Sequence, residues 1–227
     1  MQYMLDTASL TELDTALDIY PIAGVTTNPT ILRAEGQVNL RERLLSIRQR
    51  CGENRSLHVQ VTARNYEGIL ADAEAICALL GKSTYVKVPV TEPGLRAIRA
   101  LKARNVHVTA TAVYYRAQGL LAMEAGADYI APYCNRMENN GIDFRRVIEA
   151  LRALIDRDGY ASRIVAASFK NGTQIDDALL SGAHAVTVAP SLLRAALCSP
   201  LVSEAVDTFT ADYACYHGDT PLWDVLR

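Results

Sequence analysis

Eight short apolar runs alternate with amphipathic segments along the whole chain of 227 residues. The intervening segments, such as YEGILADAEAICALL and FRRVIEALRALI, place apolar residues at the spacing of one helix face. Strands that are linked by helices pair in parallel, and eight such units match a compact barrel of about 250 residues. The sequence therefore predicts an α/β fold, a (β/α)8 TIM barrel, with a doubly wound open sheet as the alternative. The runs lie at residues 2–5, 23–26, 57–61, 85–88, 106–110, 128–132, 163–167 and 185–188.

No domain boundary is visible in the sequence. The chain has 50% hydrophobic residues and lacks a Pro/Gly/Ser-rich linker or a shift in composition. We therefore expect one barrel domain over residues 1–227. The stretch 201–227 contains a ninth helical pattern and then a tail broken by Gly and Pro, which the barrel itself does not need. We expect this C-terminal helix and tail to contact a neighbouring subunit.

Charge and composition exclude several classes of protein. The chain has 23 Lys and Arg against 25 Asp and Glu with no run of like charge, which gives no indication of a nucleic-acid partner. The amino terminus resembles no signal peptide, and no stretch is apolar enough to span a membrane. Five cysteines without a CxxC pair predict reduced thiols in the cytoplasm. The four histidines lack metal-ligand spacing, so we expect neither a metal nor another cofactor.

Hydrogen-bonding or ionisable side chains lie near the ends of seven of the eight predicted strands. In a barrel of this kind, the active site assembles at the carboxyl ends of the strands. The convergence of polar groups there is the strongest functional signal in the sequence. The residues are Asp6, Thr26, Thr27, Asn28, Gln60, Lys87, Thr111, Tyr133, Arg136, Ser168 and Lys170.

Lys87 is the charged residue in the run TYVKVPVT, which otherwise has the pattern of a buried strand. Apolar surroundings disfavour the ammonium form, so they lower the pKa of a lysine and leave more free amine at neutral pH. A free amine can attack a ketone and form a Schiff base, which accepts electrons when a neighbouring carbon–carbon bond breaks. The alternatives are that Lys87 extends its amine to the barrel mouth or pairs with Asp6 as a structural ion pair.

The neighbouring strand ends supply groups suited to chemistry around such an imine. Asp6 and Tyr133 are candidates for proton transfer, Gln60 and Thr111 can orient a water molecule, and Asn28 can both donate to and accept from a substrate hydroxyl. Each also has an ordinary interpretation when it is taken alone. Asn28 then belongs to a turn, Gln60 is a satisfied strand-end amide, and Tyr133 is a core ring.

Arg136 and Ser168 follow the sixth and seventh predicted strands and are expected in loops. Barrels commonly bind phosphate near their later strands, so these residues predict a phosphorylated substrate. The competing interpretations are a solvated surface arginine and a helix N-cap serine. Lys170 is expected to be an exposed second charge.

Taken together, six motifs resemble the transaldolase family, and more closely its fructose-6-phosphate aldolase branch. The resemblance runs from about residue 3 to about residue 216. It implies a class I aldolase with the Schiff base on Lys87, a donor site that includes Asp6 and Asn28, and a ring-shaped homo-oligomer, decameric in the aldolase branch. The motifs are LDTAS at 5–9, AGVTTNPTI at 23–31, VKVPVT at 86–91, TAVYYRAQGLLA at 111–122, GADYIAPYCNR at 126–136 and AASFKNGTQ at 166–174.

The resemblance further implies Gln60, Thr111 and Tyr133 around the catalytic water, Thr27 in the substrate site, and Arg136 with Ser168 on the phosphate. Transaldolases of the family carry glutamate and phenylalanine where this chain has Gln60 and Tyr133. A tyrosine hydroxyl can protonate an enamine and release the donor product, which favours an aldolase that cleaves fructose 6-phosphate or a similar ketose phosphate. A transaldolase is the alternative within enzymes, and a phosphate-binding barrel without turnover is the alternative outside them.

The sequence departs from the aldolase branch at three places. Ala110 stands where the branch usually has glycine, and its methyl group is expected to crowd the donor pocket. NGTQ at 171–174 replaces Thr-Pro-Arg-Gln and removes an arginine near the expected phosphate site. The tail after Tyr216 also differs. These departures bear on the identity of the acceptor more than on the chemistry.

Overall fold

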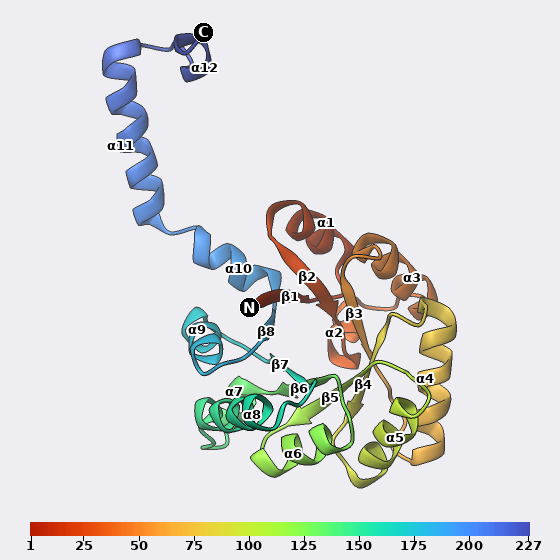
Figure 1. The fold of residues 1–227 in the computed structure, drawn as a ribbon. Helices are drawn as coiled ribbons and strands as arrows, with labels where there is room; N and C mark the ends of the chain where they lie inside the picture. The colour runs from red at the N-terminus through yellow and green to blue at the C-terminus, as the bar shows by residue number, and fades with distance from the viewer. The chain divides into compact units, whose positions relative to one another are not determined.

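The computed structural model describes residues 1–227, and its eight strands form one closed parallel barrel (Figure 1). Strand β8 pairs with β1, with Thr187 opposite Met4, so the sheet has no free edge. This closure confirms the predicted barrel and excludes the open sheet. The strands are β1 (Gln2–Asp6), β2 (Ile22–Thr26), β3 (Ser56–Gln60), β4 (Tyr85–Pro89), β5 (Val108–Val113), β6 (Tyr129–Pro132), β7 (Arg163–Ala166) and β8 (Ala185–Val188).

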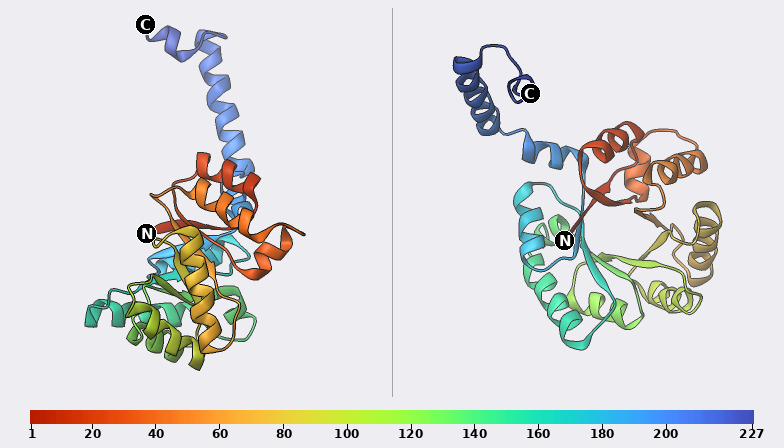
Figure 2. Two further views of the ribbon diagram at one scale, coloured as in Figure 1. Left: turned by 90° about the vertical axis from the view of Figure 1, so that its right-hand side faces the viewer. Right: turned by 45° about the horizontal axis from the view of Figure 1, so that its top comes forward.

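Helices follow the strands and form a ring outside them (Figure 2). Side-chain caps begin most of these helices; Asn65, for example, accepts a hydrogen bond from the backbone N–H of Gly68 at the start of α4. The helices around the barrel are α1 (Leu10–Ile19), α2 (Pro29–Ala34), α3 (Leu40–Cys51), α4 (Tyr66–Leu80), α5 (Glu92–Lys102), α6 (Arg116–Glu124), α7 (Cys134–Glu138), α8 (Phe144–Asp158) and α9 (Gly172–Leu180).

The fifth strand begins later and ends later than its apolar run predicts. The chain after α5 makes a tight turn in which Val106 N–H donates to Leu101 O and Asn105 has a positive φ of 58°. Because the residues before Val108 belong to this turn, β5 begins only at Val108. Near the other end of β5, Ala112 has a φ of 59° and the pairing with β6 changes register. Thr111 consequently lies inside the strand and not at its end.

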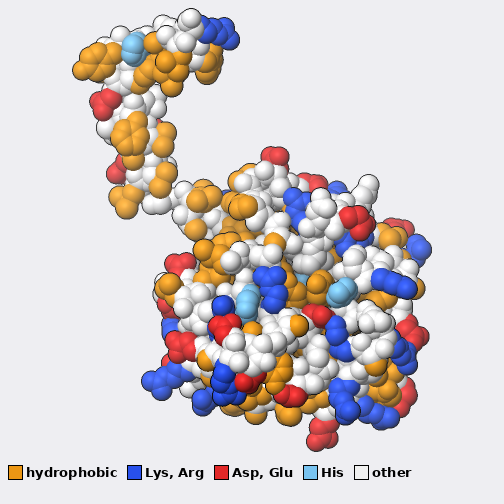
Figure 3. Space-filling model, in the orientation of Figure 1, with side chains coloured by type: hydrophobic (Ala, Val, Ile, Leu, Met, Phe, Trp, Pro, Cys, Tyr) orange, Lys and Arg blue, Asp and Glu red, His pale blue; other side chains and the backbone are white.

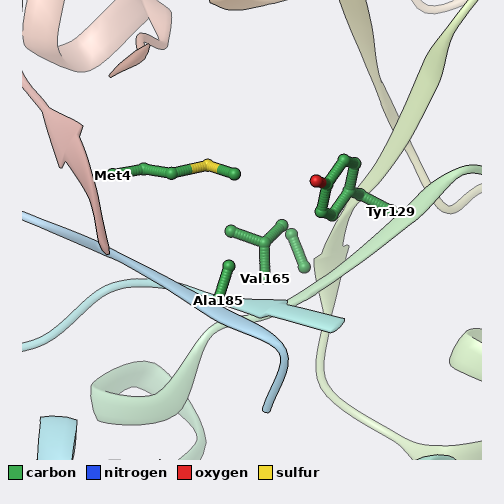
Figure 4. Close-up of a cluster of buried hydrophobic side chains, with 5 residues drawn as sticks. Met4, Tyr129, Val165 and Ala185 are labelled. Atoms are coloured by element: carbon green, nitrogen blue, oxygen red, sulfur yellow. The ribbon is translucent and has the colours of Figure 1, made fainter. Parts of the chain in front are cut away.

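The barrel interior is filled in layers. Met4, Tyr129, Ala131, Val165 and Ala185 form one buried apolar cluster, in which the Met4 side chain extends toward the others (Figure 4). The His58 ring is fully buried in the same region and stacks on the Tyr85 ring at 4.6 Å between centroids. A layer of apolar and aromatic side chains therefore closes the barrel below the carboxyl ends of the strands.

The chain divides into two compact units, residues 1–190 and residues 191–227. The second unit contains most of α10 (Pro190–Leu197), all of α11 (Pro200–His217) and α12 (Leu222–Val225). Helix α11 has no buried residue, and hydrophobic side chains gather along this unit (Figure 3). None of the helices combines the length and the apolar composition that a membrane-spanning helix needs.

Candidate active site

A cavity of about 410 Å³ opens among the carboxyl ends of the strands. It collects side chains from both halves of the barrel, as the sequence predicts. Seven of the predicted site residues line it together: Asp6, Asn28, Gln60, Lys87, Tyr133, Arg136 and Ser168. Thr111 and Thr27 do not line the cavity but contact residues that do, as described below.

Lys87 lies in the middle of β4 and is 5% exposed. Its Nζ donates a hydrogen bond of 2.8 Å to the backbone carbonyl of Thr27. Burial lowers the pKa of the Lys87 amine, while the nearby Asp6 carboxylate acts in the opposite direction. The Lys87 amine makes its hydrogen bond to this carbonyl and not to Asp6, and the side chain is buried and does not extend into solvent.

Asp6 ends β1, and its Oδ1 accepts a hydrogen bond of 2.6 Å from the Thr26 hydroxyl. Burial raises the pKa of the Asp6 carboxyl, and the charge of Lys87 and the Thr26 bond each lower it in part. The site therefore contains a carboxyl that is held toward its neutral form and an amine that is held toward its free form. The two shifts bring the pKa values of the carboxyl and the amine closer together, which suits both groups to proton exchange.

Tyr133 directly follows β6, and its hydroxyl lies 2.9 Å from the Thr111 hydroxyl. The Tyr133 ring makes an edge contact with Tyr114 at 5.9 Å between centroids. Burial raises the pKa of the Tyr133 phenol, and the Thr111 bond opposes this only in part. The phenol therefore keeps its proton at neutral pH and can donate it into the cavity.

Two polar side chains of the site have unsatisfied oxygens. The Gln60 Oε1 and the Thr27 Oγ1 atoms are buried and have no hydrogen-bond partner within the protein. Buried polar groups normally have partners, so an orphaned acceptor at the cavity is suited to a water molecule or a ligand hydroxyl. Gln60 is thus not the satisfied strand-end amide of the ordinary interpretation.

Asn28 is more restricted than the sequence suggests. Its Oδ1 caps the short helix α2 by accepting from the N–H groups of Thr30 and Ile31, at 2.9 and 3.0 Å. These bonds occupy the lone pairs of the amide oxygen. The expectation that Asn28 both donates and accepts is therefore wrong, since only its amide N–H₂ group remains for a ligand.

Arg136 lies in helix α7 and not in a loop as predicted, because the chain turns into a helix directly at Tyr133. The Arg136 guanidinium lies over the Tyr133 ring, 5.0 Å from its centroid. Ser168 does follow β7 in a loop, with a positive φ of 64°, and Asn171 rather than Ser168 caps α9. Lys170 is exposed, as expected, and also lines the cavity.

The structure corrects the expected effect of Ala110. The hydroxyls of Thr109 and Thr111 point into the barrel, where they contact His58 and Tyr133. Because side chains alternate along a strand, the Ala110 methyl points to the opposite face, and Ala110 does not line the cavity. Its methyl group therefore does not crowd the donor pocket.

The NGTQ segment has a structural role at the start of α9. Gln174 is 5% exposed and accepts from the Lys170 N–H at 2.8 Å, and its amide donates to Asn135 at 3.2 Å and to Glu138. These bonds join the loop of Ser168 to helix α7. Gln174 thereby supports the two elements that carry Arg136 and Ser168.

Two residues of the site are not predicted from the sequence. Thr187 in β8 lines the cavity, and its hydroxyl lies 2.7 Å from that of Thr26. Thr187 supplies a polar group to the cavity from the eighth strand. Its position in the apolar run AVTV does not distinguish it from an ordinary residue of a buried strand. Tyr114, which supports the Tyr133 ring, stands in the motif TAVYYRAQGLLA without a distinguishing spacing. No three His, Cys, Asp or Glu side chains gather into a group that could hold a metal ion.

Comparisons with solved structures show the fold. The native KDPGal structure is 13% identical with a TM-score of 0.55, over 82% of this chain and 80% of that one. A cube-shaped designed protein cage, made by fusing symmetric oligomeric domains, is 11% identical with a TM-score of 0.59, over 95% and 78% of the two chains. At such low identity these likenesses concern the architecture alone.

Comparisons of sequence find a relative of much higher identity. A probable fructose-6-phosphate aldolase from Streptococcus pneumoniae (strain ATCC 700669 / Spain 23F-1) is 50% identical over 213 residues, which cover 94% of this chain and 96% of that one. The family described as transaldolase/fructose-6-phosphate aldolase matches residues 3–219. The resemblance in the sequence motifs is thereby confirmed, and the chain belongs to the transaldolase/fructose-6-phosphate aldolase family.

Proposed function

We propose that the protein is a cytoplasmic class I aldolase, an aldehyde-lyase that reversibly cleaves fructose 6-phosphate or a similar ketose phosphate through a Schiff base on Lys87. The observation that carries the proposal is the environment of Lys87. Its amine is buried at the cavity and is held by a neutral carbonyl, not by a carboxylate. The name of the Streptococcus pneumoniae relative agrees with this activity.

In the cleavage direction, the Lys87 amine attacks the ketone carbon of the substrate, and loss of water gives an iminium ion. Asp6 then removes the proton of the hydroxyl on the carbon beyond the bond to be broken. That carbon leaves as an aldehyde, and the electrons of the broken bond form an enamine on the donor fragment. A proton from Tyr133 returns the enamine to an iminium ion, and water releases dihydroxyacetone from Lys87.

The remaining groups bind and orient the substrate and water. In this proposal the water that hydrolyses the imine is held by the Gln60 oxygen, which has no partner in the protein, and by the Thr111 hydroxyl beside Tyr133. The Asn28 amide donates to a donor hydroxyl, and Thr27 holds the Lys87 amine through its carbonyl. Arg136 and Ser168, on α7 and on the loop after β7, bind the phosphate of the aldehyde product.

The rival activity is transfer of the dihydroxyacetone unit to a second sugar phosphate. The Tyr133 hydroxyl favours the aldolase, because it lines the cavity with its proton retained and can protonate the enamine. Without such an acid the enamine would wait for an acceptor aldehyde.

Borohydride reduction in the presence of dihydroxyacetone tests the Schiff base directly. We expect an irreversible adduct on Lys87 in the wild-type protein and none in Lys87→Met, and the adduct residue is identified by peptide mass spectrometry. Lys170→Met, which removes the exposed lysine at the same cavity, is the matched control and should still form the adduct on Lys87. A folded wild-type protein without the adduct would favour the phosphate-binding barrel without turnover.

We also propose that the protein is a homo-oligomer, with the ring form that the family implies, in which residues 191–227 dock on another copy of the chain. Val202, Val206, Phe209 and Tyr216 recur at helical spacing on α11 and are between 54% and 87% exposed. A helix with such an apolar face is stable only when a partner covers it.

The barrel unit offers a matching surface. An apolar groove of about 730 Å³ is lined by Leu32, Leu44 and Leu79, and its charged lining is two arginines, Arg33 and Arg41, and one acid, Asp72. Helix α11 carries Glu204, Asp207 and Asp212 but no Lys or Arg, which complements those arginines. Analytical ultracentrifugation of the full chain and of Phe209→Glu tests this docking, since we expect the variant to be smaller.

A further inference from the structure

A chain of hydrogen-bonded hydroxyls ends on Asp6. The Thr26 hydroxyl lies 2.6 Å from Asp6 Oδ1, and the Thr187 hydroxyl lies 2.7 Å from that of Thr26. The two threonines are 2% and 3% exposed, so little of either side chain is open to water. Three neighbouring strands of the barrel, β1, β2 and β8, thus contribute one group each.

When Asp6 is ionised, its carboxylate fixes the direction of this chain. A carboxylate can only accept, so the single hydroxyl proton of Thr26 points to Asp6. The short contact between Thr26 and Thr187 then requires the Thr187 hydroxyl to donate to Thr26. Both distances are typical of O–H···O bonds, and a donor that itself accepts a bond is polarised into a stronger donor.

We propose that Thr187 is a positioning residue: its hydroxyl holds the Thr26 hydroxyl in the orientation that donates to Asp6, and so stabilises the carboxylate form of Asp6 in the donor site. Thr187 acts through Thr26 and does not itself transfer a proton. The catalytic consequence rests on the proposed function, in which Asp6 accepts a substrate proton. The effect of Thr187 on the ionisation of Asp6 does not depend on the proposed function.

Few other groups act on Asp6. Lys87 on β4 is the cation that lowers the pKa of Asp6, and Tyr133 after β6 is the phenol on which the Asp6 charge acts. The neighbouring strands β2 and β8 contribute only the hydroxyls of Thr26 and Thr187. A change at Thr187 is therefore expected to reach Asp6 through Thr26 alone.

The test compares substitutions of similar shape. Thr187→Val keeps the branched side chain and removes the donor, while Thr187→Ser keeps the hydroxyl; Thr187→Ala serves if valine prevents folding. Thr84→Val is the matched control, because the Thr84 hydroxyl is also fully buried but donates to the Leu80 carbonyl at the end of α4. The control measures what loss of a buried threonine hydroxyl does elsewhere in the barrel.

The primary measurement is the titration of the Asp6 carboxyl carbon by ¹³C NMR on the full-length protein, with the signal assigned by its absence in Asp6→Asn. We expect a higher midpoint in Thr187→Val than in the wild type, a midpoint near the wild type in Thr187→Ser, and no change in Thr84→Val. In the double variant Thr26→Val/Thr187→Val, the midpoint should equal that of Thr26→Val alone, since the chain is already broken.

The catalytic measurement is kcat/KM for cleavage of fructose 6-phosphate. We expect Thr187→Val to lower it about two- to tenfold at pH 7, with its acid limb moved to higher pH, as suits loss of one neutral hydrogen bond. The proposal would be overturned if the Asp6 midpoint in Thr187→Val equals that of the wild type. It would also be overturned if adding Thr187→Val to Thr26→Val shifts the midpoint as much as Thr187→Val does alone. Failure of borohydride trapping in the wild type would refute the proposed function instead, because the Asp6 titration needs no turnover.

Discussion

Replacing Tyr133 by phenylalanine should separate aldol cleavage from transfer chemistry. The substitution removes one hydroxyl, whose partner in the protein is Thr111 at 2.9 Å. The ring remains, and with it the edge contact with Tyr114 and the contact with the Arg136 guanidinium. Loss of one neutral hydrogen bond costs about 0.5–1.5 kcal/mol in the free energy of unfolding. The fold should therefore survive with a modest loss of stability.

The expected effect on catalysis is much larger than the effect on stability. A positioned general acid contributes about 10²–10⁴-fold to a proton transfer. If Tyr133 protonates the enamine, the Tyr133→Phe variant should release product more slowly by a factor in that range. The Schiff base on Lys87 forms before the enamine does, so its formation does not depend on protonation of the enamine by Tyr133. Borohydride trapping should consequently stay close to that of the wild type.

The assay follows glyceraldehyde 3-phosphate released from fructose 6-phosphate through a coupled reductase, without an acceptor sugar. We expect sustained release by the wild type, and by Tyr133→Phe a single burst that resumes when erythrose 4-phosphate is added. Tyr114→Phe is the control, because it removes a neighbouring phenol hydroxyl and keeps the edge contact between the rings. Full aldolase activity in Tyr133→Phe, or an equal loss in Tyr114→Phe, would refute the role given to Tyr133.

Three further predictions concern charge and assembly. Since the Asp6 carboxylate raises the pKa of Lys87, Asp6→Asn should move the pH dependence of borohydride trapping at Lys87 to lower pH, and an unchanged profile would contradict their coupling. Burial lowers the pKa of His58 from 6.5 to about 3. Between these two pH values the unfolded state binds a proton at His58 and the folded state does not. The free energy of unfolding therefore falls as the pH drops from 6.5 to about 3, by at most about 1.4 kcal/mol per pH unit. Urea unfolding at pH 7 and pH 4 should show that His58→Gln loses less stability on acidification than the wild type. Phe209→Glu should yield a smaller assembly by ultracentrifugation, whereas Leu180→Glu, an exposed apolar residue of α9, should leave the assembly unchanged.

The architecture could be predicted because strands and helices have different hydrophobic periods. The eight apolar runs became eight strands, and their alternation with helices left parallel closure as the simplest arrangement. The same rule places side chains from distant strands at one end of the barrel. It brought Asp6, Lys87 and Tyr133 to one cavity, although they lie on β1, on β4 and after β6.

Details that depend on local backbone hydrogen bonds could not be predicted in this way. The amide oxygen of Asn28 accepts hydrogen bonds from the first turn of α2. Arg136 lies in a helix because α7 begins directly after Tyr133. The orientation of Ala110 depends on the register of β5, which starts later than its apolar run. Periodicity locates an element within a few residues, but an error of one residue in a strand reverses the direction of a side chain.

Thr187 shows why a residue can matter to a site without a signal in the sequence. It stands among apolar residues in β8, where threonine is an ordinary strand former, and its significance comes only from closure of the barrel. Because β8 returns to pair with β1, Thr187 reaches Thr26, and Thr26 reaches Asp6. The same closure buries Lys87, whose pKa falls, and Asp6, whose pKa rises. The uncharged hydroxyls then become the means of stabilising the Asp6 carboxylate without adding a second cation that would lower the pKa of Lys87 further.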